Sequence, residues 1–284
     1  MSLEAVARKD FQDAVRSRWL LGLTAFFILL VSAVVYLMRP GPGQTIPTSA
    51  LLGSIYIRDA LVTTLIPLIA LVVSYNAVVG ERETGSLKLL LALPHSRADV
   101  VFGKVVGRAG AIAMPVSVGF LLPALVAAIG PLSLQVGTFL GYILLTLLLS
   151  SAFVAIAVGF SAAVSSNRFA IGGAVGLYFL FVPLWGAIQF PLRLYLGMGG
   201  GPSWLPISGS ELLQLLRLIN PTGSFKIVAG EWVGTTLFAA GQAGVEGGAG
   251  QYATNMEIAA FAMLAAWLLV PPLLGLWRFE GADL

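Results

Sequence analysis

The chain lacks cysteine, has a single histidine, and devotes only 10% of its 284 residues to charged side chains. Without cysteine there are no disulfides, thiolate metal sites or cysteine nucleophiles, so the redox compartment cannot be read from the sequence. The lone histidine, His95, excludes a metal cage built from several histidines. A soluble globular domain carries roughly 25% charged residues. So few charges cannot cover a water-facing surface, and most of the outer surface must therefore face lipid.

Hydrophobic residues make up 58% of the chain, and the mean hydropathy is +0.92. A bilayer core about 30 Å thick needs roughly 20 apolar helical residues. Six segments meet this requirement, so the sequence predicts an all-α membrane protein in which residues 1–284 form a single transmembrane domain. The predicted spans are residues 19–38, 60–79, 105–129, 136–164, 170–190 and 258–277.

Residues 3–18 precede the first span and have an amphipathic helical pattern. Val6, Phe11 and Val15 fall on the apolar face, whereas Arg16 belongs to the polar face. Such a helix can lie in the membrane interface with its apolar face against the acyl chains. We therefore expect an interfacial helix at the N-terminus.

The positions of the basic residues predict the orientation. With the N-terminus inside, eleven of the sixteen Lys and Arg residues fall on the cytoplasmic side and five on the other. Both termini are therefore expected in the cytoplasm, and the protein in the cytoplasmic membrane. The basic residues are not clustered as in a nucleic-acid patch, so no nucleic-acid partner is expected.

The predicted cytoplasmic loop, residues 80–104, contains a leucine-rich run. Leu87, Leu90 and Leu91 share one helical face. Pro94 is expected to end this short helix at or before the preceding residue. The pattern indicates a compact, stiff knob and not a flexible linker.

The residues around the leucine-rich run carry two further signals. Ser96 and Asp99 have the spacing of a capping box for the next helix. Gly80 and Gly85, followed by Ser86, resemble a phosphate loop, but the lysine that would reach the phosphates is missing. No nucleotide site is expected in this chain, so any ATP must be bound by another protein.

The predicted outer loop, residues 191–257, contains a leucine-rich amphipathic segment, Glu211–Ile219. We expect Ser210 to be its N-cap, and Asn220 and Pro221 to end it. The segment is too short to cross a bilayer, so a re-entrant or surface helix is expected. The loop is long enough to shape an exit path or to bind an extracytoplasmic partner, although its second half is equally consistent with a disordered connector.

Two pairs of glycines in or next to the predicted spans have the spacing that allows helices to approach closely. They are Gly103 with Gly107, and Gly172 with Gly176. The spans hold almost no ionisable residues, which argues against a proton or ion relay across the membrane.

The knob carries a resemblance to a known family. It reads Gly80-Glu81-Arg82-Glu83-Thr84-Gly85-Ser86-Leu87-Lys88-Leu89-Leu90-Leu91-Ala92-Leu93-Pro94, then Ser96-Arg97 and Phe102-Gly103-Lys104. This stretch resembles the signature of the ABC type-2 exporter permeases, from which it departs at Ser86 and Lys88. The likeness extends over the whole chain, and Asn220-Pro221-Thr222 is similar to the branch of the family that serves nitrous-oxide-reductase maturation.

The resemblance implies an exporter built from two permeases and two ATPase subunits, in which ATP and Mg²⁺ are bound by the ATPase and no cofactor by this chain. It implies that the knob docks on the ATPase. The residues expected to couple the two proteins are Glu81, Glu83, Gly85, Leu87, Leu90, Leu91, Pro94 and Arg97.

Two other classes of function stay open on the sequence. A membrane enzyme would need a polar cluster at the interface, for which only His95, Arg97 and Asp99 are available. An ATP-independent channel or scaffold would have the same sequence features as a permease without its ATPase.

Overall fold

The computed structural model describes residues 2–37, 46–47, 61–92, 96–128, 132–133, 135–197, 208–233 and 249–282. Within these ranges almost all residues are helical. The helices are α1 (Ser2–Val15), α2 (Arg18–Leu37), α4 (Leu61–Ser74), α5 (Val79–Glu83), α6 (Ser86–Ala92), α7 (Arg97–Ala128), α8 (Val136–Ala163), α9 (Asn167–Phe179), the π-helix η2 (Leu180–Leu184), α10 (Trp185–Gly197), α11 (Gly209–Ile219), α12 (Pro221–Val233) and α14 (Ala249–Glu280). Two short strands, β1 (Ile46–Pro47) and β2 (Leu132–Ser133), pair in parallel.

Five of the described helices are long and apolar enough to cross a membrane. They cover Leu61–Glu83, Arg97–Leu122, Val136–Ala163, Asn167–Leu196 and Asn255–Glu280. Counting α1 and α2 as one bent pair, with 65° between them, gives up to six. The prediction of an all-α membrane protein is confirmed.

The helices on either side of the predicted cytoplasmic loop extend into it. The long helix that begins at Leu61 continues to Glu83, past the predicted end of the span at residue 79. The next long helix, α7, begins at Arg97, before the predicted start of its span at residue 105. The knob is therefore built directly on the ends of two long helices, which explains how so short a segment can be held stiffly.

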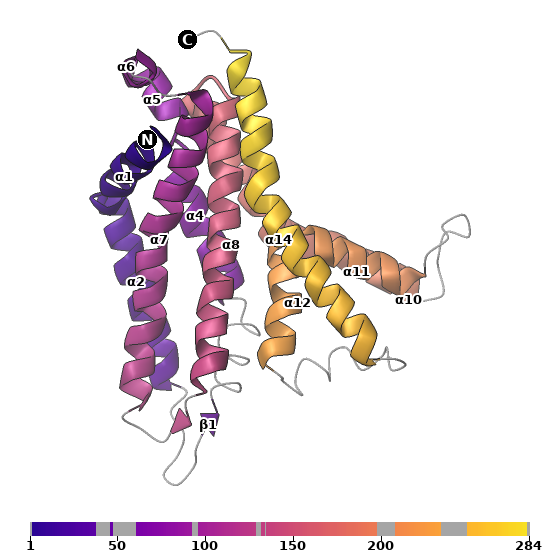
Figure 1. Ribbon diagram of the computed structural model, residues 1–284. Coiled ribbons are helices and arrows are strands. Elements are labelled where there is room, and N and C mark those ends of the chain that lie inside the picture. Colours follow the sequence, from indigo (N-terminus) through magenta and orange to yellow (C-terminus); the bar gives the residue numbers. More distant parts are fainter. Residues whose placement is uncertain are drawn as a thin grey trace.

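Helix α8 lies at the centre of the bundle and packs against α14, α7, α4 and α12. In Figure 1 the long helices α2, α7 and α8 stand roughly upright, and α5, α6 and both ends of the chain lie at the same end of the bundle. The interior of the bundle contains a row of aromatic rings. Phe27, Phe120, Tyr142 and Phe225 meet edge to face, with ring centroids 6.0, 5.8 and 5.6 Å apart. Each such contact stabilises by about 0.5–1.5 kcal/mol beyond burial, so the row joins α2, α7, α8 and α12.

The long helix Asn167–Leu196, which comprises α9, η2 and most of α10, differs from the others because little of it is buried inside the chain. Only 6% of its most apolar stretch is buried, compared with 72% for α8. It is interrupted by η2, which contains Pro183. Proline removes a backbone donor, and π-helical turns often occur at functional positions. After η2 the chain continues into α10, and Figure 1 shows α10 and α11 projecting sideways from the bundle.

Candidate functional site

The knob consists of α5 and α6, which are joined by Thr84 and Gly85. Gly85 has a φ angle of +74°, in the left-handed region that only glycine adopts without strain. The Thr84 hydroxyl donates to the carbonyl of Gly80 at 3.0 Å and lies 3.0 Å from the hydroxyl of Ser86. The glycine thus allows the chain to turn sharply between α5 and α6, and the hydrogen bonds of the Thr84 and Ser86 hydroxyls stabilise this turn.

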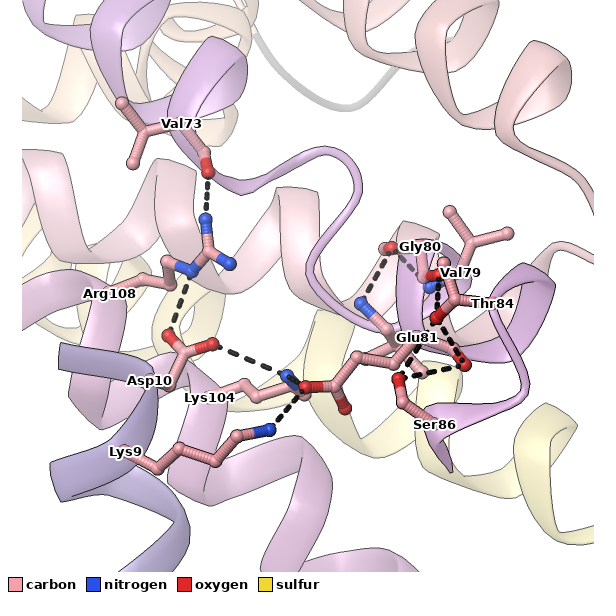
Figure 2. A network of polar contacts seen from close by, with 12 residues as sticks. Lys9, Asp10, Val73, Val79, Gly80, Glu81, Thr84, Ser86, Lys104 and Arg108 are labelled. Atoms are coloured by element: carbon pink, nitrogen blue, oxygen red, sulfur yellow. Dashed lines mark hydrogen bonds and ion pairs between the residues drawn. The ribbon is translucent and has the colours of Figure 1, made fainter. Parts of the chain in front are cut away.

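Glu81, at the base of the knob, forms ion pairs with two other helices (Figure 2). Its Oε1 lies 3.0 Å from the Nζ of Lys9 on α1 and 3.0 Å from the Nζ of Lys104 on α7. One carboxylate therefore joins α5 to both α1 and α7.

Asp10 of α1 extends this set of ion pairs further into the bundle. Its Oδ1 lies 3.3 Å from the Nζ of Lys104, and its Oδ2 accepts from the Nε of Arg108 at 2.8 Å. Arg108 also donates to the backbone carbonyl of Val73, at the end of α4. Figure 2 shows the side chains converging from these helices. We call Lys9, Asp10, Glu81, Lys104 and Arg108 the α1–α7 charge network.

The centre of this network is buried, whereas Lys9 at its edge is exposed, and burial determines the energetics of the centre. Lys104 is 2% exposed and Asp10 is 3% exposed. A buried charge costs several kcal/mol in lost hydration unless it is paired. Here three cations surround two carboxylates, and one of the cations, Arg108, also donates to the Val73 carbonyl. Removing Asp10 would leave Arg108 without its carboxylate partner and Lys104 with Glu81 alone, so the network helps to define how α1, α5 and α7 fit together.

Helix α1 packs closely on α7 at the first glycine pair. A Cβ on Gly103 would lie 2.8 Å from the Cβ of Val6, and one on Gly107 would lie 2.6 Å from the carbonyl oxygen of Ala7. The close contact expected of this pair is confirmed. The expectation that the apolar face of α1 lies against acyl chains was wrong for Val6, which is only 3% exposed because it packs on α7. Phe11 and Val15 are half-buried against the core, and Arg16 is exposed.

The second glycine pair faces a different environment. A Cβ on Gly172 or Gly176 would meet no atom within 4 Å. The same spacing therefore produces a tight contact in α7 and an open surface on α9.

Glu83, the second acidic residue of the knob, reaches α9. Its Oε1 accepts from the backbone N–H of Asn167 at 2.6 Å. The N-cap residue of α9, Ser166, has no side-chain capping bond of its own. Glu83 therefore satisfies a donor at the N-terminus of α9, where a negative charge is also favoured by the helix dipole.

Arg97 links the start of α7 to the C-terminal end of α14. Its Nη1 donates to the carbonyls of Phe279, Glu280 and Ala282, the last two at 3.1 Å. The guanidinium carbon also lies 5.0 Å from the centroid of the Phe279 ring. A helix C-terminus leaves carbonyls without intrahelical partners, and a cation is favoured there. Neither Glu83 nor Arg97 binds the N-terminal helix: they bind α9 and α14.

The leucines expected to contact a partner protein are not equivalent. Leu87 is 1% exposed, so it holds α6 against the bundle and offers no contact surface. Leu90 is half-buried against the core. The side chain of Leu91 lies outside the described residues. Sequence reasoning missed Leu89, which is 74% exposed on α6.

The ends of the helices around the knob follow the expected rules. Helix α6 ends at Ala92, as expected from the following proline, although Pro94 and His95 themselves lie outside the described residues. The predicted capping box is confirmed, because the Ser96 N–H donates to Asp99 at 2.9 Å and the Asp99 N–H donates to the Ser96 hydroxyl at 3.0 Å.

The Asn220-Pro221 motif ties two helices to η2. The Asn220 side chain donates to the carbonyl of Phe181 at 2.8 Å, and its oxygen accepts from the N–H and the hydroxyl of Thr222 at 2.8 Å each. The corner between α11 and α12 is thereby bonded to η2, the π-helical turn between α9 and α10. The expected N-cap of the preceding helix was wrong. Ser208, not Ser210, caps α11 in a capping box with Glu211.

Sequence reasoning also missed Lys9, Asp10, Lys104 and Arg108. The available signal was the spacing of Lys104 and Arg108, four residues apart on one face of a helix that also carries Gly103 and Gly107. Two cations beside two small residues indicate a face that approaches another helix closely, and such a face requires an acidic partner. Among the described residues, no group of three or more His, Asp or Glu side chains could hold a metal ion.

These features define an integral membrane protein of long helices, with a knob at one end that is bonded through its charged side chains to several of them. The chain belongs to the ABC-2 transporter family, because the model of the family described as "ABC-2 family transporter protein" matches residues 4–284. It is a permease subunit of an ABC transporter.

Two curated relatives are similar over most of their length. Each is named a probable ABC transporter permease protein NosY, one from Stutzerimonas stutzeri and the other from Pseudomonas aeruginosa. Each is 34% identical to this chain over 227 residues, which cover 78% of this chain and 79% of the relative.

Proposed function

We propose that the chain is the membrane-spanning half of an ATP-driven exporter whose ATP and Mg²⁺ are bound by two copies of a separate ATPase. The observation that carries the proposal is the set of bonds from the knob. Glu81 bonds to α1 and α7, and Glu83 bonds to the N-terminus of α9. A displacement of α5 and α6 therefore reaches three other helices through short polar contacts, as rigid-body coupling requires.

The ATPase contact that we propose is centred on Leu89. A large apolar side chain that is 74% exposed beside the exposed Lys88 and Ala92 is suited to insertion into an apolar groove. Leu87 and Gly85 serve this contact indirectly, since the first anchors α6 and the second allows the reversal before it. Leu90 and Leu91 stay members of the proposed contact face, and Pro94 is proposed to end it.

Two copies of the chain are proposed to form the permease, with α9 and α10 at their interface. Support comes from the low burial of this long helix within one chain and from the open glycines Gly172 and Gly176. Small residues allow helix backbones to approach closely in membranes, where apolar burial alone gives little driving force. A two-fold arrangement would bring this face against its own copy.

The proposed orientation places both termini and the knob in the cytoplasm and the cell membrane around the long helices. The common location of α5, α6 and both chain ends at one end of the bundle supports it (Figure 1). The loop of residues 191–257 is then extracytoplasmic and is proposed to shape the exit path or to bind an outer partner. Within it, residues 198–207 and 234–248 lie outside the described residues.

The test is purification of the chain in mild detergent from its own membranes, followed by native mass spectrometry and an ATPase assay. We expect two copies of the chain with two copies of a P-loop ATPase. Leu89→Asp should remove the ATPase from the complex, because a charge would have to be buried in the docking groove. Leu89→Met, which keeps the apolar volume, should retain it.

Thermal unfolding of both variants provides the control for folding, since Leu89 is exposed and neither change should lower the unfolding midpoint appreciably. A chain that purifies without any ATPase in every detergent would overturn the exporter proposal and favour an ATP-independent channel or scaffold. Retention of the ATPase by Leu89→Asp would instead overturn only the docking contact.

A further inference from the structure

Three cations lie close to one another on α10, α11 and α12, away from the knob. Arg193 donates to the Oε1 of Gln189, one turn earlier on α10, at 3.4 Å. The Cγ of Arg217, on α11, would lie 3.2 Å from a Cβ on Gly223, which lies three residues before Lys226 on α12. We call Arg193, Arg217 and Lys226 the α10–α12 cation row.

No carboxylate balances this row within the part of the chain that the structure describes. All of the ion pairs found there belong to the α1–α7 charge network. Burial lowers the pKa of Arg217 below its ordinary value, and the charge of Arg193 lowers it further. Burial likewise lowers the pKa of Lys226, and the charge of Arg217 adds to the effect. Arg217 and Lys226 are therefore each partly buried near another cation, which costs free energy, whereas Arg193 is exposed.

Two further observations indicate a ligand at the row. Lys226 lines a cavity of about 360 Å³ between α4, η2 and α12, together with the hydroxyl-bearing Thr64, Tyr178 and Thr222. Gln189 is only 8% exposed, and its Nε2 has no hydrogen-bond partner among the residues that the structure describes. An unmade hydrogen bond on a buried donor costs about 1–3 kcal/mol. A donor of this kind beside a guanidinium is the arrangement expected where an acceptor binds.

We propose that Lys226, Arg217, Arg193 and the Nε2 of Gln189 form a binding site for an anion, with the cavity beside Lys226 receiving the ligand. Guanidinium groups bind oxyanions through paired N–H donors, whereas lysine acts as a point charge, so phosphate-type groups fit this set. The group is either the headgroup of an anionic phospholipid or a soluble oxyanion. The cavity walls also include the apolar Phe179 and Val182, which would accommodate the adjoining chain of an amphiphile.

The experiment uses the purified full-length chain, without any ATPase, in two arms. In neutral detergent, thermal unfolding is followed against inorganic phosphate, with sodium chloride at matched ionic strength as the reference. In nanodiscs of phosphatidylcholine containing phosphatidylglycerol, native mass spectrometry counts the anionic lipids retained by the chain. A phosphate-specific rise of the unfolding midpoint identifies a soluble oxyanion, and retained phosphatidylglycerol identifies a lipid headgroup.

The variants are Lys226→Gln and Arg217→Gln, with Arg18→Gln as the matched control, since Arg18 is an exposed cation on α2. We expect each cation-row variant to weaken binding at least about tenfold, as loss of a charge-assisted hydrogen bond should. The control should bind as the wild type does. Without ligand, Lys226→Gln should unfold at the same temperature as the wild type or higher, because one repelling charge is gone.

Absence of both signals in the wild type would overturn the proposal. So would wild-type binding by Lys226→Gln and Arg217→Gln, or a ligand-free Lys226→Gln that unfolds at a lower temperature. Because the measurement needs no ATPase, none of these outcomes bears on the exporter proposal.

Discussion

The α1–α7 charge network and the α10–α12 cation row both contain charges that are withdrawn from water: Asp10 and Lys104 are buried in the network, and Arg217 and Lys226 are half-buried in the row. In the network, every cation lies within ion-pair distance of a carboxylate. In the row, the described residues supply no carboxylate at all, and the pKa values of Arg217 and Lys226 lie below their ordinary values. The network has its own counter-charges and so can serve as a permanent joint, whereas the row stays short of negative charge until something else supplies it.

The two regions should therefore respond with opposite sign to loss of a charge. In the network, removing Asp10 leaves Arg108 without its carboxylate partner and Lys104 with Glu81 alone, so stability falls. In the row, removing one member relieves repulsion, which is why Lys226→Gln is expected not to destabilise the ligand-free chain.

The largest effect is expected from Asp10→Ala. This change leaves Lys104 and Arg108 without a carboxylate that both contact, and Lys104 is 2% exposed. Breaking a buried pair by removing one partner costs about 3–5 kcal/mol. Chemical unfolding of the purified chain should show a loss of this size, and Asp13→Ala, an exposed position on the same helix, should show little change.

The charge pairing itself is tested by a second change. Asp10→Ala combined with Arg108→Met should be more stable than Asp10→Ala alone, because the guanidinium that loses its carboxylate partner is replaced by an apolar side chain. Equal stability of the single and double variants would contradict the ion-pair account of the network.

An intermediate effect is expected from Gly107→Ala. The added methyl would lie 2.6 Å from the carbonyl oxygen of Ala7, so the backbones of α1 and α7 must separate. Overpacking of this kind costs about 1–3 kcal/mol. Gly22→Ala is the control, since a Cβ there meets nothing within 4 Å and alanine favours the helix. Thermal unfolding should place the two variants on opposite sides of the wild type, and a stabilised Gly107→Ala would refute the close contact.

The smallest effect concerns Glu211, whose carboxylate is hydrogen-bonded at the N-terminus of its own helix, α11. The Ser208 N–H and hydroxyl donate to its carboxylate, and these bonds lower the pKa of Glu211 below the ordinary value of 4.5. A lowered folded pKa means that the capping contribution is present above pH 4.5 and is lost as the pH falls through the lowered value. Amide exchange in the first turn of α11 should accelerate over that window.

Ser208→Ala should show faster exchange in that turn already at neutral pH, since the cap is absent. Ser210→Ala should leave it unchanged, because Ser210 does not cap the helix. If Ser210→Ala rather than Ser208→Ala frayed the helix, the capping assignment would fail.

The knob was largely predictable from local rules. The leucine run, the following proline and the spacing of Ser96 and Asp99 report on helix and cap formation over a few residues, where sequence neighbours are also spatial neighbours. The functions of Glu83 and Arg97 were not predictable. Both bind the ends of helices that are remote in sequence, and a helix end has no signal that names its partner.

By itself, the sequence determined that the chain is a helical membrane protein of the ABC-2 type with a stiff knob, because apolar runs of about 20 residues and a run of local motif residues need no tertiary information. Only the tertiary structure decided that Leu87 is buried while Leu89 is exposed, that one glycine pair is closed and the other open, and that one group of cations is neutralised while another is not. Burial and charge pairing depend on which distant side chains meet, and in a bundle of similar apolar helices the sequence pattern alone does not specify that.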